Sequence, residues 1–389
     1  MKDKDQMFIW SNWWWFEGDK AWFVDGRTNT LFCVDLNTGE CEKVDCVPTS
    51  GEDIYCQNPY CVKCGRDIYC IPGYGGSIWI YNLDDNTFTE VDIDIPKQHL
   101  PGSQFWIWGD ILFIVMANWN KVIEVSISQR RITNYYIICE NDSVRRSVLV
   151  GDQIYAVSSE TGRIYQFDIL TKDVRVYIHS EITKKLFTIC FDGEKFWLGG
   201  YQKDIYIWDK EKDNLAAISF PDDIQIGRID NDPFPMFGRA VAVGEYIWFI
   251  PGKAESIIYA NKKTTVLSVF EICEEDKICI PLQNSQGVNN YVFQYVRDDR
   301  YIGFFSPRSS RIFEIDAKQL TYQWKEYYLS EQYLQQYCDT CKGIYYEGRD
   351  PLCIPDYHMR SLTAGRKSKN IDTDSIGKEI YTRLKGDVQ

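Results

Sequence analysis

Four residues near the C-terminus have the types and spacing of metal ligands. Two residues separate Cys338 from Cys341, and Cys353 and His358 follow within the next 17 residues. Thiolate and imidazole are the ligands that zinc prefers, and a two-residue gap between cysteines suits a tetrahedral site. The longer gap before Cys353 belongs to no standard zinc module. We therefore expect either a structural zinc ion in this segment or four side chains without a metal.

A second group of candidate residues shares one position of a sevenfold repeat, five residues before a recurring turn. Two of its members are arginines, and the others are aromatic, amide or hydroxyl residues. Guanidinium groups bind carboxylates or phosphates through paired hydrogen bonds. We expect either a central pocket for an anionic or glycan-like ligand, or arginines that pair with neighbouring acids. The seven residues are Trp13, Tyr60, Gln104, Arg146, Thr188, Arg239 and Gln294.

A third candidate is the Asn118-Trp119-Asn120 segment, in the loop between the second and third strands of one unit. An indole has an apolar face and a polar edge, and the adjacent amides can hydrogen-bond sugar hydroxyls. The pattern predicts a rim that binds a glycan, and the alternative is additional packing between neighbouring units. Five further tryptophans are extra to the repeat, namely Trp13, Trp14, Trp15, Trp106 and Trp108.

Catalytic motifs are absent from the sequence. It contains no Gly-x-Ser-x-Gly elbow, no His-Glu-x-x-His pair and no P-loop. Its three histidines, His99, His179 and His358, occupy unrelated positions of the repeat. A lyase or hydrolase that uses Asp or Glu and a metal at a central channel is the alternative to a binding protein. The carboxylates are too numerous for the sequence to single out a pair.

A unit that recurs seven times must position these residues. Each unit begins with a turn, usually Gly followed by a charged residue, and an aromatic residue stands four positions later in six units. Another strand-like segment ends 16 or 17 residues after the turn, whereas successive units begin 42 to 55 residues apart. A nearly constant spacing within the units and a variable spacing between them are not expected by chance. The turns begin at Gly18, Gly65, Gly109, Gly151, Gly193, Gly244 and Asp299, and the later segments end at Asp35, Asn82, Ser126, Asp168, Asp209, Ala260 and Asp316.

Each unit contains four segments with the features of β-strands. Apolar and β-branched residues alternate with polar ones between Gly, Asn and Asp turns, as is typical of antiparallel meanders. One such unit cannot bury both of its faces, and radial repetition of the unit solves this problem. The sequence therefore predicts an all-β, seven-bladed β-propeller over residues 7–330. Because both ends contain complete units, the sequence leaves open how the ring closes.

One unit resembles a kelch repeat. From Gly193 to Asp209, a strand ending in the Gly199-Gly200 doublet is followed by a loop and a strand ending in Trp208 and Asp209. Elsewhere Pro-Gly pairs replace the doublet in two units, and the later tryptophan of kelch units appears only as Trp324. The resemblance to kelch-like or WD-repeat-like propellers implies the fold and a bias toward binding, and it implies no chemistry.

Residues 331–389 break the repeat and form a C-terminal extension. Within it Ile376, Ile380 and Leu384 recur every four residues, which predicts a helix at about 374–385 with one apolar face. This helix either docks on the flank of the propeller or serves as a partner-binding peptide on a flexible tether.

Composition narrows the class of protein. The chain has 389 residues, 43 Lys and Arg against 56 Asp and Glu, a formal charge of −13, and 15% aromatic residues. These values exclude global disorder and argue against a nucleic-acid binder, and no apolar run is long enough to span a membrane. Without a signal-peptide pattern, we expect a cytoplasmic, monomeric protein whose 14 cysteines are mostly reduced. We expect a non-catalytic intracellular binding or scaffolding module that recognises a protein or a glycan-like ligand through one rim.

Overall fold

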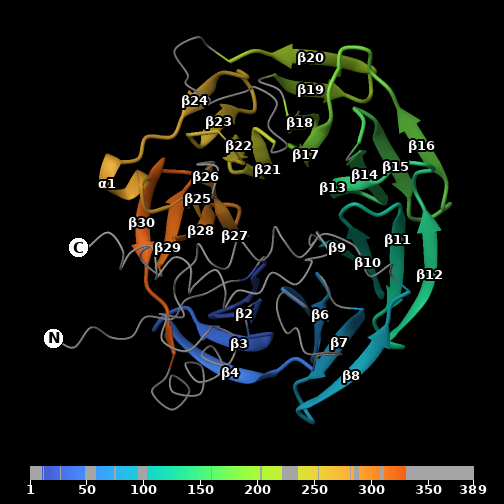
Figure 1. Cartoon of the computed structure of the whole chain (residues 1–389), viewed down its shortest axis with the longest axis vertical. Coiled ribbons are helices and arrows are strands. Elements are labelled where there is room, and N and C mark those ends of the chain that lie inside the picture. The colour runs from blue at the N-terminus through green and yellow to red at the C-terminus, as the bar shows by residue number, and fades with distance from the viewer. Residues whose placement is uncertain are drawn as a thin grey trace, which may run out of the picture. The chain divides into compact units, whose positions relative to one another are not determined.

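The structure, a computed structural model, describes residues 11, 13–26, 28–48, 58–73, 76–94, 103–158, 160–201, 204–220, 235–252, 254–280, 282–283, 289–306 and 311–329. Seven four-stranded antiparallel sheets stand as blades in a ring, which confirms the predicted seven-bladed β-propeller (Figure 1). A single short helix, α1 (Glu274–Lys277), occurs in these ranges, and none of their helices is long and apolar enough to cross a membrane. The C-terminal extension and its expected helix lie outside the described residues.

In every blade the first strand along the chain lies innermost, and the fourth is the outermost of these four strands (Figure 1). Blade 1 contains β1 (Trp15–Glu17), β2 (Lys20–Asp25), β3 (Thr30–Asp35) and β4 (Glu40–Cys46). Blade 2 contains β5 (Tyr60–Cys64), β6 (Asp67–Ile71), β7 (Ser77–Asn82) and β8 (Thr87–Asp92). Blade 3 contains β9 (Ser103–Trp108), β10 (Ile111–Met116), β11 (Lys121–Ser126) and β12 (Arg131–Ile137). Blade 4 contains β13 (Val144–Val150), β14 (Gln153–Ser158), β15 (Ile164–Asp168) and β16 (Val174–Tyr177).

The remaining blades follow the same order. Blade 5 contains β17 (Leu186–Phe191), β18 (Phe196–Gly200), β19 (Ile205–Asp209) and β20 (Asn214–Ile218). Blade 6 contains β21 (Phe237–Val243), β22 (Tyr246–Pro251), β23 (Ile258–Asn261) and β24 (Leu267–Val269). Blade 7 contains β27 (Val292–Arg297), β28 (Tyr301–Ser306), β29 (Arg311–Asp316) and β30 (Thr321–Lys325). A two-stranded sheet of β25 (Leu282–Gln283) and β26 (Asn289–Asn290) precedes blade 7, and β31 (Tyr328–Leu329) follows it.

The glycine that reveals the repeat is required by backbone conformation. In five blades a two-residue loop that starts with this glycine joins the first two strands, and its φ is positive, for example 56° at Gly18 and 62° at Gly65. A two-residue hairpin loop with positive φ at its first residue favours glycine there. In blade 7, Asp298 and Asp299 adopt positive φ in a longer loop instead. The first turn is thus a backbone requirement that the sequence displays directly.

The turn between the third and fourth strands has an equally regular cause. A side-chain oxygen at the end of the third strand accepts hydrogen bonds from backbone N–H groups two or three residues later, as Asp35 does from Asn37 and Thr38. In blade 6 this residue is Asn261, so the sequence-based assignment of Ala260 was one residue early. The seven accepting residues are Asp35, Asn82, Ser126, Asp168, Asp209, Asn261 and Asp316.

These turns make stability depend on pH in a predictable direction. Hydrogen bonds from the backbone of Thr171 and Leu170 lower the pKa of Asp168 below 3.8, although slight burial opposes them. Because the folded-state pKa is depressed, the stabilisation is complete above 3.8 and is lost as the pH falls through the folded-state pKa. Asp168→Asn keeps the accepting oxygen, as the natural Asn82 and Asn261 do. We expect its melting temperature to match the wild type at pH 7 and to fall less on acidification to pH 3.

Thermal melting of wild type and Asp168→Asn across that pH range checks this expectation. The control is Glu140→Gln at an exposed position, whose melting curve should shift with pH as the wild type does. If the wild type and Asp168→Asn lost equal stability below pH 3.8, the turn would not be the cause.

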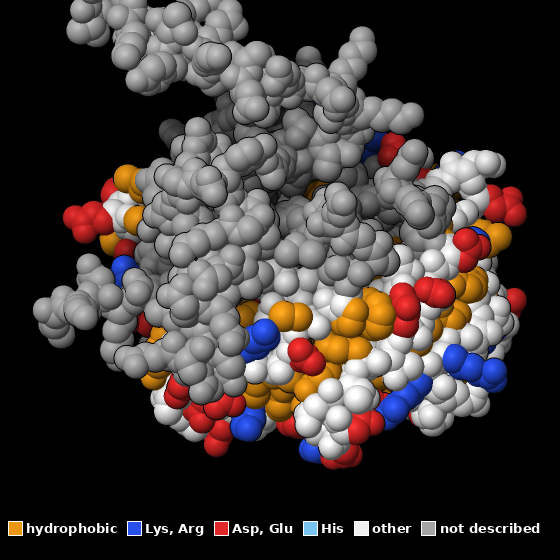
Figure 2. Space-filling view, turned by 60° about the horizontal axis from the view of Figure 1, so that its bottom comes forward, with side chains coloured by type: hydrophobic (Ala, Val, Ile, Leu, Met, Phe, Trp, Pro, Cys, Tyr) orange, Lys and Arg blue, Asp and Glu red, His pale blue; other side chains and the backbone are white. Residues whose placement is uncertain are grey.

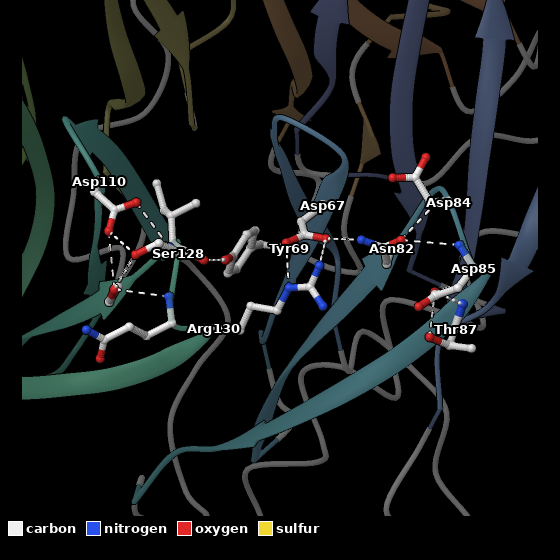
Figure 3. Close-up of polar contacts among 12 residues, drawn as sticks. Asp67, Tyr69, Asn82, Asp84, Asp85, Thr87, Asp110, Ser128 and Arg130 are labelled. Atoms are coloured by element: carbon white, nitrogen blue, oxygen red, sulfur yellow. Dashed lines mark hydrogen bonds and ion pairs between the residues drawn. The ribbon is translucent and has the colours of Figure 1, made fainter.

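Neighbouring blades are tied together by ion pairs that start from the same turns. Arg130, in the turn between β11 and β12 of blade 3, reaches back to Asp67 of blade 2, with its Nε and Nη2 each 2.7 Å from a carboxylate oxygen (Figure 3). Asn82 donates to the same carboxylate at 2.7 Å, and the Tyr69 hydroxyl donates to the carbonyl of Ile127 at 3.0 Å. Because Arg130 is bidentate, these contacts fix the angle between blades 2 and 3 as well as their distance.

Aromatic packing and one added strand close the ring between blades 7 and 1. Trp14 is 1% exposed, stacks on Phe23 at 4.7 Å, and contacts Tyr295 of blade 7 at 5.4 Å and Tyr327 at 5.1 Å. After blade 7, β31 pairs in parallel with β4, the outer strand of blade 1. Both terminal blades are therefore complete, and closure adds a fifth strand to blade 1.

Blade 7 lacks the recurring aromatic residue because another ring takes its place. Gly303 stands where the other blades have Trp22, Tyr69 or their equivalents. The ring of Tyr295, from the neighbouring strand β27, covers Gly303, and a Cβ added there would lie 2.4 Å from the Tyr295 Cζ atom. The Tyr295 hydroxyl donates to Glu314 at 2.8 Å. The seventh unit is thus a rearranged version of the same packing.

Burial decreases from the centre of each blade to its outer edge. All residues of β6 are buried, whereas the outer strand β8 is exposed or half-buried along its length. Figure 2 shows a face on which hydrophobic, acidic and basic side chains lie interspersed. The acidic side chains do not form one continuous patch on this face.

Candidate functional site

The innermost strands of four consecutive blades contain a β-bulge. The pairing register shifts between Val144 and Arg146 in blade 4, the equivalent shifts occur in blades 5 and 6, and the shift in blade 7 lies one residue further along the repeat. A bulge leaves one residue unpaired and turns the following side chains to a new direction, and bulges are frequent next to active sites. The unpaired residues are Arg145, Phe187, Gly238 and Gln294.

Three of the seven predicted positions link one blade to the next. The Gln104 Oε1 atom accepts from the backbone N–H and the hydroxyl of Ser147 in blade 4, the latter at 3.0 Å. The Thr188 hydroxyl oxygen accepts from the backbone N–H of Ala240 in blade 6, and Gln294 accepts from the Ser11 hydroxyl at 3.0 Å. These polar side chains satisfy backbone or hydroxyl groups between blades and are part of the scaffold.

Arg146 and Arg239 differ from these three because neither makes an ion pair or a hydrogen bond within the described part of the chain. The Arg146 Nε atom is buried and has no partner among these residues. Burial lowers the pKa of Arg146, and burial together with the charge of Arg146 lowers the pKa of Arg239 to about 9. At a pKa of about 9, Arg239 remains charged at neutral pH. Neither guanidinium group has a paired acid among the described residues, and the pocket for an anionic ligand stays a prediction.

Aromatic rings from several blades surround the two guanidinium groups. Trp13, which precedes β1, contacts Phe105 of blade 3 edge-on at 5.7 Å and Arg239 of blade 6 at 5.6 Å. A residue that touches blades 3 and 6 from blade 1 must lie near the axis of the ring (Figure 1). The Arg239 guanidinium also lies 4.3 Å from the ring centre of Phe293 in blade 7. We call this group the axial cluster: Trp13, Tyr60, Phe105, Arg146, Arg239 and Phe293.

The axial cluster has unused hydrogen-bond donors. Besides Arg146 Nε, the indole Nε1 of Trp13 is buried and has no partner among the described residues. Tyr60 is 5% exposed, and its hydroxyl is close enough to both arginines to influence their pKa values. Arg146, Arg239 and Trp13 are half-buried as whole residues, although the Arg146 Nε and Trp13 Nε1 atoms themselves are buried. Two charges and an indole N–H on the axis of a propeller are suited to bind an anion.

Asn118 and Trp119 contribute to the contact between blades 3 and 4, and Trp119 packs in the same hydrophobic cluster as Tyr60. Trp119 is 6% exposed and forms an isolated β-bridge with Val144. Asn118 has a φ of 59° and accepts a hydrogen bond from Arg145 at 3.0 Å. The Arg145 guanidinium stacks on Phe187 of blade 5 at 4.4 Å. These contacts favour the packing alternative for Trp119, and glycan binding at this rim stays a prediction.

The expected zinc ligands Cys338, Cys341, Cys353 and His358 lie outside the described residues. Within the described residues, no group of three or more His, Cys, Asp or Glu side chains is placed to hold a metal ion. Ten cysteines are described and all are free. Cys61 and Cys64 pack in different clusters on the two faces of β5, as expected for residues three apart on a strand.

The sequence did not indicate Phe105, Phe293 or Arg145 as parts of this region. Phe105 follows Gln104 directly, Phe293 precedes Gln294, and Arg145 precedes Arg146. A search one residue to either side of the repeat position would have found all three. Bulges involve Arg145 and adjoin Phe293, whereas β9, which contains Phe105, pairs with β10 without a register shift.

Comparison with known proteins identifies the architecture. No family model matches the chain, and no curated protein matches its sequence. Among solved structures, virginiamycin B lyase from Staphylococcus aureus is similar with a TM-score of 0.56 and 12% identity, over 77% of this chain and 93% of that one. A streptogramin B lyase is similar with a TM-score of 0.54 and 11% identity, over 78% of this chain and 93% of that one. The likeness is one of fold.

A computationally designed protein, Ika8, has a similar score, with a TM-score of 0.53 and 9% identity over 84% of this chain and 90% of that one. At such identities a shared propeller carries no activity from those lyases to this chain. Kelch-like membership has no support beyond the propeller itself.

Proposed function

We propose that this protein is a binding module that holds an anionic ligand on the axis of the ring, with Arg146 and Arg239 as its main contacts. The observation that carries the proposal is a pair of buried, like-charged guanidinium groups with no acidic partner among the described residues. Burying such charges without partners costs folding free energy. A bound ligand that supplies the missing negative charge would offset this cost. The expected protein or glycan-like ligand is thereby narrowed to one that presents an anionic group.

A titration with anions tests the proposal. At constant ionic strength, the wild-type protein is titrated with carboxylates and phosphates while melting temperature and binding heat are recorded. A charge-assisted hydrogen bond contributes about 1.5–3 kcal/mol, so Arg146→Gln with Arg239→Gln should weaken binding at least about tenfold. The matched control is Arg66→Gln, because Arg66 is an exposed arginine paired with Asp84 at 2.7 Å. Equal affinity in wild type and the double variant would refute the proposal.

A further inference from the structure

The surroundings of the two arginines restrict the ligand further than its charge does. Rings from four blades make up the rest of the axial cluster, and only Tyr60 adds a hydroxyl group: Trp13, Tyr60, Phe105 and Phe293. A ligand group that lies beside Arg239 therefore meets the faces and edges of aromatic side chains. Aromatic rings bind other flat apolar groups by stacked or edge-on contact.

The arrangement of the donors favours a planar anion. Phe293 lies 4.3 Å from the Arg239 guanidinium carbon, so one face of this guanidinium group is covered. The N–H edges of a planar guanidinium are its hydrogen-bonding surface, and they match the two oxygens of a carboxylate. Arg146 Nε and Trp13 Nε1 add two donors that lie in the planes of their own groups. Such donors suit a flat carboxylate in which both oxygens accept.

The cost of losing hydration favours a carboxylate over a phosphate at this site. Burial lowers the pKa of both arginines, because buried surroundings solvate charge less well than water. A doubly charged phosphate loses more hydration on entering such a site than a singly charged carboxylate. An apolar ring attached to the carboxylate gains free energy from the same surroundings.

From these observations we infer that the axial cluster binds an aromatic carboxylate, its carboxylate between Arg146 and Arg239 and its ring against Trp13 and Phe293. The inference rests on the proposed function, because it names the class of anion that the arginines hold.

Four probes separate the contributions of ring, charge and head-group shape. Benzoate has both ring and carboxylate, acetate lacks the ring, benzyl alcohol lacks the charge, and phenyl phosphate replaces the carboxylate. We expect benzoate to bind at least about tenfold more tightly than each of the other three. It should exceed acetate because its ring is buried and stacked, benzyl alcohol because it is charged, and phenyl phosphate because it loses less hydration. Binding is measured by isothermal titration and by saturation-transfer NMR on the full chain.

Variants on each side of the site complete the test. Phe293→Leu keeps an apolar side chain and should reduce the preference for benzoate over acetate at least about threefold. Phe88→Leu, on the outer strand of blade 2, is the matched control and should leave both affinities unchanged. Equal binding of benzoate and acetate, or tighter binding of phenyl phosphate, would overturn the inference. The proposed function would survive if that binding still required the two arginines, and it would fail if no probe bound in an arginine-dependent way.

Discussion

Substitution of Gly303 by Ala should lower the free energy of unfolding by about 2–3 kcal/mol, the usual cost of overpacking a core. A Cβ at this position would lie 2.4–2.7 Å from three ring atoms of Tyr295. Tyr295 is 1% exposed and bonded to Glu314, so its ring cannot move aside without losing a buried hydrogen bond. Replacing Gly by Ala in a strand otherwise stabilises it by roughly 0.5–1 kcal/mol. Because the cost of the clash is larger than this gain, Gly303→Ala should be destabilising.

A double-mutant cycle isolates that clash. Tyr295→Leu removes the ring atoms that the new methyl group would meet, so in this background Gly303→Ala should be neutral or slightly stabilising. Tyr295→Phe keeps the ring and serves as the control, and Gly303→Ala should remain destabilising in this background. Urea denaturation of the set measures the coupling. Similar costs of Gly303→Ala in the Tyr and Leu backgrounds would show that the ring of Tyr295 is not what requires glycine.

Replacing both axial arginines by Met should raise the free energy of unfolding by about 1–3 kcal/mol, although most core substitutions lower it. In the unfolded chain Arg146 and Arg239 are hydrated and far apart. In the folded chain burial and mutual repulsion disfavour their charges, and no acid among the described residues offsets this. Met fills similar volume without a charge. Such a loss of folding stability is expected at the proposed ligand site, since the bound ligand would supply the interaction that the two arginines lack.

Urea denaturation at pH 7 without added carboxylate measures this gain. Arg130→Met is the control, because Arg130 is paired with Asp67 through two contacts of 2.7 Å and its loss should reduce stability. A double variant less stable than the wild type would mean that Arg146 and Arg239 stabilise the fold. Their part in a ligand site would then lose its main support.

The residues that the sequence identified correctly are those whose roles are local. Gly18 and its equivalents are required by positive φ in a two-residue loop, and Asp35 and its equivalents bond to their own turn. Such causes act within a few residues, so they repeat visibly along the chain. The unit count, the four strands per blade and the seven-bladed ring follow from them.

Contacts between distant blades could not be predicted in the same way. The repeat position that contains Arg146 and Arg239 also contains Gln104 and Thr188, which link neighbouring blades. Nothing in the sequence separates these roles, because they depend on which groups of the next blade come near after the bulges. The same holds for Gly303, whose purpose appears only when Tyr295 is seen to cover it.

The amino-acid sequence by itself determined the blades of this protein, because hairpin turns and alternating strands are encoded by short-range preferences. Only the tertiary structure decided which side chains meet on the axis of the ring. Trp13, Arg146 and Arg239 come from blades 1, 4 and 6, and they meet because the ring closes. Closure of the ring determines whether a buried charge has a partner, and the spacing of residues along the chain does not predict it.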